Sequence, residues 1–409
     1  MRALVLALTL SMFVGCTTEP DMARYVSGEV REEGFATSVV EMVGPDPVVD
    51  SMTSATLESR IVQIVDRARE QVLVAASDFE SIAVADALVR ASQRGVSVSV
   101  VGDADRSTQA GFGALNAAGV PITFGNGELF WTPNLDVSIL RSGDTNKMLQ
   151  SLLVVDYIDS VFLTHGFVGA SSEVRQVAIF SVYEELGRDM GDVIDQMFGG
   201  TFANTLTLFD APLSSDPNNR TIYPTYNEPF EYYTGPGEPL IKHVIDEVYD
   251  ARANVWLVSS SFDHRQLADA LVYKARAGFD VRVVVSAAAL ERSEEQVSYL
   301  QQAFDAIRAP GEAYPVVLIR EWDSGSIVSL DTETSPLTGL PSASSVMVLS
   351  QSIHASAGFR QIAPSRYQAQ ESDIFTDASM FVVQQTTTGQ QPNLDRLSTF
   401  MRQLTGEVP

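Results

Sequence analysis

The chain contains four histidines, and their sequence context bears on whether it can carry out phosphoester chemistry. A histidine followed two residues later by a lysine would place an imidazole nucleophile beside a fixed positive charge. Cleavage of a phosphodiester needs both groups, because negative charge develops on the phosphate oxygens. At that spacing the four histidines are instead followed by Phe167, Ile245, Gln266 and Ser356.

His165 and His354 are the remaining candidates for a catalytic or binding role. A histidine beside a glycine at the end of a strand is more often a hydrogen-bonded structural residue. Arg175, Arg360 and Arg366 follow the two histidine segments. A guanidinium would bind an anion there, whereas an arginine on a solvated turn would have no such role. The candidate cleft residues are His165, Ser356 and Arg360.

Other chemical motifs are absent from the sequence. It has no cysteine and histidine cluster for zinc, no phosphate-binding G-x-x-x-x-G-K-[ST] loop and no G-x-S-x-G elbow. Acidic pairs such as Glu294-Glu295 lack the spacing of a calcium loop. We expect Asp263 to cap a helix beside His264, and we assign His243 no role. We therefore predict no metal and no cofactor.

The amino terminus has the pattern of a bacterial export signal. Arg2 precedes an apolar run over residues 3–14, which is too short to span a bilayer as a helix. The segment F-V-G-C at 13–16 resembles a lipobox, and Cys16 is the only cysteine. We predict that Cys16 is lipidated and holds the protein to a membrane of the bacterial cell envelope, although a plain secretory signal would look similar. Thr17 after the cysteine favours the outer membrane.

The charge balance makes nucleic acid a poor partner. The chain has 27 basic and 52 acidic residues, a net charge of -25. Such a surface repels phosphate backbones, and a saline habitat would favour the same composition.

The elements that would position any site occur twice. The segment VLVAASDF at 72–79 is followed by ADALV at 85–89 and RGVSV at 94–98. The segment VWLVSSSF at 255–262 is followed at the same spacing by ADALV at 268–272 and AGFDV at 277–281. Two copies this far apart indicate a duplicated domain, and strands alternating with helices indicate a mostly parallel α/β sheet.

The duplication divides the chain into five predicted segments. They are a signal peptide and lipobox at 1–16, a flexible tether at 17–54, a first half at 55–205, a linker at 206–238 and a second half at 239–409. The tether and the linker are assigned from their proline and glycine content.

This order of elements resembles the phospholipase D superfamily over about residues 55 to 405. The resemblance implies two duplicated α-β-α sandwich halves related by pseudo-twofold symmetry, with one active site where they meet. In that family each half supplies an H-x-K-x4-D motif, which provides a histidine nucleophile or proton donor, a phosphate-binding lysine and an orienting aspartate.

The motif positions are degenerate in this sequence. In the first half they are occupied by Leu149, Ser151 and Asp156. In the second half the best match places Ala343, Ser345 and Ser350 there. We expect Leu149 and Ala343 to meet at one interface. Asp156, without its cationic neighbours, must find another partner or lie near water.

We therefore predict a lipid-anchored phospholipase D-like pseudoenzyme that acts as a binding or scaffolding protein at the cell envelope. Its partner would be an unidentified protein or envelope ligand, and the chain would be a monomer with an internal pseudo-dimer. A divergent phosphodiesterase that uses His165 or Asp156 is the first alternative. A purely structural envelope protein is the second.

Overall fold

The computed structural model describes residues 37–45, 50–125, 146–199, 221–223, 230–334, 341–354, 359–363, 366–369, 375–385 and 391–406. The predicted signal peptide and Cys16 lie outside these residues. We call residues 37–199 the first half and residues 221–406 the second half. No helix in the described ranges is both long enough and apolar enough to cross a membrane.

The first half is built on a seven-stranded mixed sheet with the strand order β1-β8-β7-β6-β2-β3-β4. The central strand β2 is an apolar run whose last five residues are buried, as expected for a strand covered on both faces. The strands are β1 (Thr37–Val43), β2 (Gln71–Ala76), β3 (Ser97–Gly102), β4 (Ile122–Phe124), β6 (Ser151–Val155), β7 (Asp159–Leu163) and β8 (Gln176–Val182).

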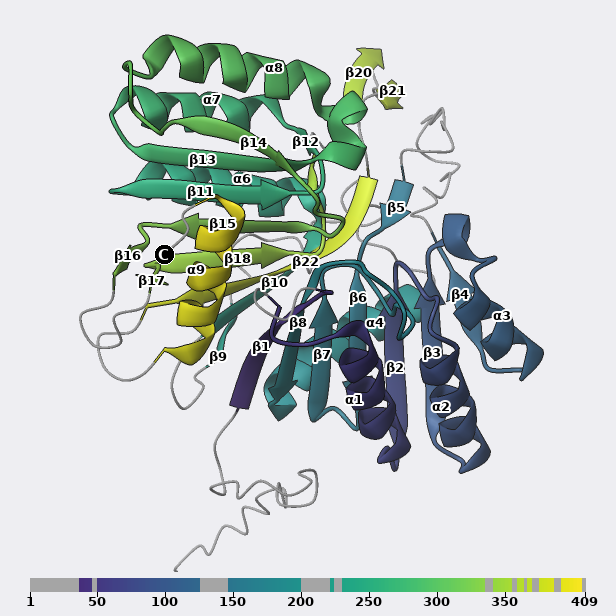
Figure 1. The fold of residues 1–409 in the computed structure, drawn as a ribbon. Coiled ribbons are helices and arrows are strands. Elements are labelled where there is room, and N and C mark those ends of the chain that lie inside the picture. Colours follow the sequence, from purple (N-terminus) through teal and green to yellow (C-terminus); the bar gives the residue numbers. More distant parts are fainter. Residues whose placement is uncertain are drawn as a thin grey trace, which may run out of the picture. The chain divides into compact units, whose positions relative to one another are not determined.

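Helices cover both faces of this sheet (Figure 1). Three of them, α1 (Ser54–Asp66), α2 (Ile82–Gln93) and α3 (Ala110–Ala117), pack on one face, and α4 (Glu184–Phe198) packs on the other. Ser81 caps α2 by accepting a hydrogen bond from the Val84 amide at 3.0 Å. After α2 the chain turns at Gly95, whose φ of 87° favours glycine.

The second half repeats this plan with the strand order β14-β13-β11-β15-β18-β22-β10-β9. The helices α6 (Gly237–Asp250), α7 (Arg265–Arg276) and α8 (Leu290–Ile307) correspond to α1, α2 and α3, and α9 (Pro392–Leu404) corresponds to α4. The strands are β9 (Thr221–Tyr223), β10 (Phe230–Pro236), β11 (Asn254–Ser259), β13 (Asp280–Ser286), β14 (Val316–Arg320), β15 (Ser326–Leu330), β18 (Ser345–Leu349) and β22 (Phe375–Gln384).

Several short elements complete the described part. β5 (Asn146–Met148) pairs in parallel with β22 of the second sheet. The remaining two-stranded pairs are β12 (Phe262–Asp263) with β19 (Ile353–His354), β16 (Glu333–Thr334) with β17 (Pro341–Ser342), and β20 (Phe359–Ala363) with β21 (Arg366–Ala369). Single 3-10 turns lie at Ala104–Arg106 and Ala287–Ala289.

The two halves share a hydrophobic core. Each half has an outer core beneath its three helices, and a third core combines residues of both sheets with α4 and α9. Helix α9 also reaches the first sheet, because Asn393 accepts a hydrogen bond from the Val40 amide and donates one to the Ser38 carbonyl, both at 2.9 Å. The duplicated α/β halves predicted from the sequence are confirmed. The prediction of a mostly parallel sheet was wrong. Along the two strand orders only β2-β3-β4 and β11-β13-β14 pair in parallel, and the other neighbouring strands are antiparallel.

The predicted boundaries of the halves differ from the structure at both amino-terminal ends. Residues 37–43, assigned to the flexible tether, form β1 and pair with β8. Residues 230–236, assigned to the linker, form β10 and pair with β22. Proline and glycine nearby suggested irregular chain, but both segments carry enough β-branched and aromatic residues to complete their sheets.

Candidate functional site

β6 of the first half and β15 of the second half are structural counterparts. Val155 of β6 pairs with Val72, and Leu330 of β15 pairs with Val255, which is the repeat counterpart of Val72. After each strand the chain turns at an aspartate with positive φ, 50° at Asp156 and 53° at Asp331. The two strands thus end in the same local structure.

The two aspartates also have the same structural role. The Asp156 carboxylate accepts hydrogen bonds from the backbone amides of residues 69, 70 and 71. The Asp331 carboxylate accepts them from the amides of residues 252, 253 and 254. Asp156 has therefore found its partner in the backbone. It lies at the end of β6 opposite to Ser151, which makes it unsuitable as a nucleophile in a site that contains His165.

The register corrects the sequence assignment in the second half. β18 is the counterpart of β7, since both pair with the motif strand on one side and with the last long strand on the other. Ser345 pairs with Leu330, beside Asp331, and Ala343 precedes Ser345. Leu149 lies beside Gln150, which bonds Ser379 next to Ser350, whereas Ala343 lies at the other end of β18. The prediction that Leu149 and Ala343 meet was therefore wrong. The counterparts of Leu149, Ser151 and Asp156 are Ser324, Ser326 and Asp331.

The wrong match had a physical cause. β18 reads S-V-M-V-L and looks like a buried strand, whereas β15 reads S-I-V-S-L with Ser329 at its fourth position. The spacing between the halves also changes from 183 residues at β2 to 175 residues at β6, because the segments between these strands differ in length. Ser350 follows β18 and accepts a hydrogen bond from the Ser379 amide at 3.0 Å, as Thr164 does from the Val177 amide at 2.8 Å.

The serines at the lysine positions are buried and hydrogen bonded within their own half. Ser151 Oγ lies 2.7 Å from Ser77 Oγ and donates to the His165 carbonyl at 3.1 Å. Ser326 Oγ lies 2.9 Å from Ser259 Oγ and donates to the Gln351 carbonyl at 2.8 Å. Both hydroxyls therefore hold backbone segments together and carry no charge.

The residues before these serines lie where the halves meet. Ser324 donates a hydrogen bond to the Arg175 carbonyl of the first half, and the Gly325 amide donates to the Thr164 carbonyl at 3.0 Å. Gln150, the counterpart of Gly325, accepts a hydrogen bond from Ser379 Oγ at 3.1 Å. Leu149 is half-buried beside this contact. The starts of the two motif strands thus form part of the contact between halves.

A buried tyrosine extends this polar contact. Tyr232 Oη lies 3.1 Å from Ser379 Oγ, and burial raises the pKa of Tyr232 to about 12. The phenol therefore stays protonated at neutral pH and adds a neutral hydrogen bond to the contact between halves.

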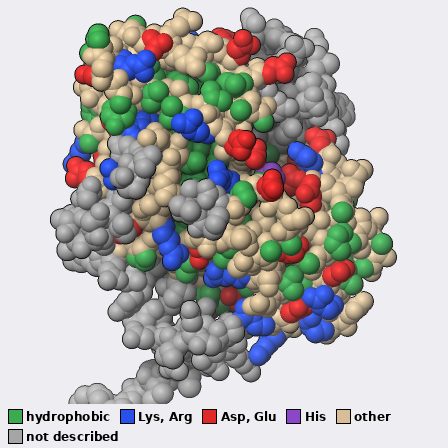
Figure 2. Space-filling view, in the orientation of Figure 1, with side chains coloured by type: hydrophobic (Ala, Val, Ile, Leu, Met, Phe, Trp, Pro, Cys, Tyr) green, Lys and Arg blue, Asp and Glu red, His purple; other side chains and the backbone are tan. Residues whose placement is uncertain are grey.

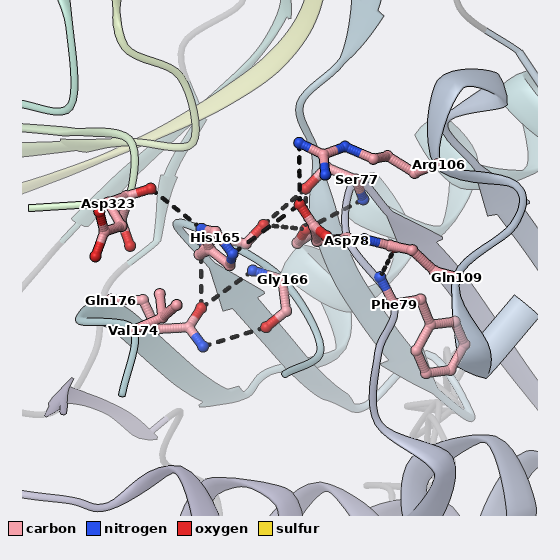
Figure 3. Close-up of polar contacts among 12 residues, drawn as sticks. Ser77, Asp78, Phe79, Arg106, Gln109, His165, Gly166, Val174, Gln176 and Asp323 are labelled. Carbon is pink, nitrogen blue, oxygen red and sulfur yellow. Dashed lines mark hydrogen bonds and ion pairs between the residues drawn. The ribbon is translucent and has the colours of Figure 1, made fainter. Parts of the chain in front are cut away.

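His165 lies at the same contact (Figure 3). Its Nδ1 is 3.2 Å from the carbonyl oxygen of Asp323 in the second half, and its Nε2 is 4.0 Å from Asp78 Oδ2. Gln109 donates a hydrogen bond to the other oxygen of Asp78. Arg106 Nη2 lies 3.9 Å from Asp78 Oδ2. This histidine is the one predicted cleft residue whose side chain the structure describes at the junction.

The other candidates are placed elsewhere or lie outside the description. Arg175 Nε is 3.5 Å from Asp50 Oδ2, so its guanidinium is engaged by a buried carboxylate. Ser356 lies outside the described residues, and Arg360 lies in β20 with its side chain undescribed. His264 itself caps α7, in place of Asp263, by accepting a hydrogen bond from the Leu267 amide at 3.3 Å.

Sequence reasoning missed Asp78, Arg106 and Gln109. Asp78 belongs to the repeated segment, but its counterpart Ser261 has no charge, so the repeat gave no signal. Arg106 and Gln109 lie near the start of α3, and tertiary contacts alone bring them to Asp78. The described residues contain no group of three or more side chains suited to holding a metal ion.

Comparisons with known proteins place the fold. The structure is similar to phosphatidylserine synthase from Haemophilus influenzae, with 11% sequence identity and a TM-score of 0.55 over 90% of this chain and 86% of that one. The similarity extends through both halves. The chain shares the fold of that synthase, with two similar α/β halves.

Two shorter proteins also match. Nuc of Salmonella typhimurium, a phospholipase D family member, has 15% identity and a TM-score of 0.29 over 40% of this chain and 95% of its own. NucT of Helicobacter pylori has 14% identity and a TM-score of 0.32 over 40% of this chain and 96% of its own. No family model matches the sequence, and no curated protein does.

Proposed function

We propose that this protein is a pseudoenzyme of the phospholipase D fold that binds a partner or ligand at the bacterial cell envelope. One observation carries the proposal. The strand positions that would hold histidine and lysine contain Leu149 and Ser151 in the first half and Ser324 and Ser326 in the second half. Phosphoryl transfer requires positive charge near the phosphate oxygens, and neither strand offers one.

The hydrogen bonds of these residues support the same conclusion. Ser151 and Ser326 are buried, and each is bonded to a neighbouring serine and a backbone carbonyl. Binding of a phosphate there would break these contacts and bury its charge without a cation. Such a cost favours a neutral or cationic ligand over a phosphodiester.

A divergent phosphodiesterase is the second candidate, and His165 is the observation that favours it. Its imidazole is partly exposed at the junction of the halves, with Asp78 nearby. Among the described side chains, Arg106 is the arginine at this cluster, and it faces the Asp78 carboxylate, so its charge is already partly balanced. This arrangement makes His165 a weak candidate for phosphoryl transfer.

Phosphodiesterase activity distinguishes the two candidates. The folded chain and its His165→Ala variant are assayed on a chromogenic phosphodiester and on mixed phospholipid vesicles. We expect no turnover above a buffer control from either protein. Turnover that His165→Ala abolishes would overturn the pseudoenzyme and assign His165 as a catalyst.

We further propose that Cys16 anchors the protein through attached lipid. Mass spectrometry of the mature amino terminus should find an acylated cysteine, and Cys16→Ser should release the protein from the membrane fraction. Thr17→Asp is the matched control for sorting, because it keeps the lipid but should shift the protein toward the inner membrane. An unmodified Cys16 in the mature chain would contradict anchoring.

A further inference from the structure

The His165 ring has one tautomer that fits its surroundings. Its Nδ1 faces the Asp323 carbonyl oxygen at 3.2 Å. Because a carbonyl oxygen can only accept, Nδ1 must carry the proton. In the neutral ring Nε2 is then a hydrogen-bond acceptor, and it points toward Asp78.

Asp78 presents a second acceptor to the same space. Gln109 donates to Asp78 Oδ1, and Gln109 Oε1 is itself held at 2.6 Å by the Phe79 amide. Asp78 Oδ2 is left facing His165 Nε2 at 4.0 Å, which is too long for a hydrogen bond (Figure 3). Two acceptors thus face each other across a gap, and Gln109 fixes the orientation of the carboxylate.

The spacing defines the kind of group that fits. An atom that lies about 2.8 Å from each acceptor can donate to both when the acceptors are this far apart. The atom must carry at least two hydrogens, which excludes a single hydroxyl. A primary ammonium carries three and also brings the positive charge that a carboxylate attracts.

The surrounding charge favours a cation. The Asp78 side chain is 15% exposed, so its charge is only partly screened by water. Arg106 is 55% exposed and 3.9 Å away, which makes it a weak and displaceable partner. Figure 2 shows histidine and acidic side chains next to each other on one face of the molecule, and the net charge of the chain is -25. A cation would be attracted to such a surface.

We propose that His165 Nε2 and Asp78 Oδ2 form a binding site for the primary ammonium group of a ligand. The inference rests on the proposed binding function and gives it a ligand class. The counterpart positions in the second half hold Gln351 and Ser261, so the described residues there offer no carboxylate and imidazole pair at this place.

Nitrogen NMR of the histidine-labelled full chain in detergent tests the site. The His165 signals are assigned by their loss in His165→Gln. Methylammonium chloride should shift the Nε2 signal saturably, whereas tetramethylammonium chloride at equal concentration should not, because it donates no hydrogen bonds. An equal response to both salts, or no response to either, would overturn the proposal.

Two variants make the test specific. Asp78→Asn should weaken methylammonium binding at least tenfold, because the new amide can itself donate to Nε2. Arg106→Gln should tighten binding severalfold, because it removes a competing cation, and a merely structural arginine would not have this effect. Weaker binding in Arg106→Gln would contradict the site. If Asp78→Asn does not fold, the comparison of the two salts and the Arg106→Gln variant still test whether the site binds a primary ammonium.

Failure of this inference is distinct from failure of the proposed function. If the protein binds no methylammonium and also shows no phosphodiester turnover, the proposed ligand class is wrong but the pseudoenzyme proposal stands. Turnover on the phosphodiester would overturn the pseudoenzyme whatever the NMR result.

Discussion

The two halves keep the same supporting contacts but differ where chemistry could occur. Asp156 and Asp331 each accept backbone amides, and Ser151 and Ser326 each bond a neighbouring serine. At the junction, however, the first half has His165 with Asp78, and the second half has Gln351 with Ser261. Duplication thus preserved the residues that hold the backbone, while the ionisable pair exists in one copy.

The same contrast appears in the residue that holds the loop after the first central strand. In the first half Gln109 accepts a hydrogen bond from the Phe79 amide at 2.6 Å and also orients Asp78. In the second half Ser293 accepts from the Phe262 amide at 2.8 Å. The backbone contact is the same, but the short serine replaces a side chain that reaches a carboxylate. We infer that the first half keeps the capacity for binding.

The largest expected effect concerns the core that the halves share. Phe381 is 1% exposed and packs against Phe162 of the first half, with ring centroids 5.0 Å apart. Phe381→Ala should lower the free energy of unfolding by about 3–5 kcal/mol, measured by urea denaturation. The exposed Tyr273→Ala is the control, expected within about 0.5 kcal/mol of the wild type. A loss below 1 kcal/mol would show that the two halves are not coupled through this core.

A smaller loss is expected where the second half requires glycine and the first half does not. A Cβ atom at Gly325 would collide with the backbone oxygen of Leu349, whereas its counterpart is Gln150. Gly325→Ala should cost about 2–3 kcal/mol in urea denaturation. Gly113→Ala in α3 has nothing within 4 Å of the new Cβ and should stabilise by up to about 1 kcal/mol. Equal results for the two variants would refute the close approach at Gly325.

The counterpart aspartates offer a test of symmetry. Asp156→Ala and Asp331→Ala should each destabilise by about 1–2 kcal/mol, because each leaves backbone amides without their acceptor. Asn at either position keeps a side-chain oxygen and suits a positive φ, so it should cost less. Thermal unfolding followed by circular dichroism measures all four variants. A large effect in one half alone would contradict the structural equivalence of β6 and β15.

The smallest effect is expected at the position that distinguishes the halves. His165→Gln gives the first half the residue found at Gln351, and the backbone carbonyl that Ser77 and Ser151 bond remains. The free energy of unfolding should change by no more than about 0.5 kcal/mol. A much larger loss in urea denaturation would mean that His165 serves the fold, which would weaken its assignment to ligand binding.

The sequence predicted the duplicated α/β halves because the repeat preserved helix and strand signals at fixed spacing. It failed at β1 and β10, where glycine and proline near the strand ends suggested irregular chain. It also misplaced the motif strand of the second half. Ser329 interrupts the apolar run of β15, whereas the apolar run of β18 is uninterrupted after its first residue. Strand pairing over long separations decided both cases.

The candidate site was only partly predictable. His165 was found because histidines are few, but Asp78, Arg106 and Gln109 come together through tertiary contacts that no spacing encodes. The lipidation of Cys16 stays a prediction, since the residue lies outside the described ranges. Polar residues that come together only in the folded chain cannot be identified from sequence patterns.

Phosphate binding tests the central claim most directly, namely that the junction of the halves no longer holds a phosphate. Isothermal titration of the folded chain with orthovanadate and with inorganic phosphate measures it. The account predicts no saturable binding of either anion at millimolar concentration. Saturable binding that His165→Gln or Arg106→Gln removes would contradict it and would restore a phosphate site at the junction.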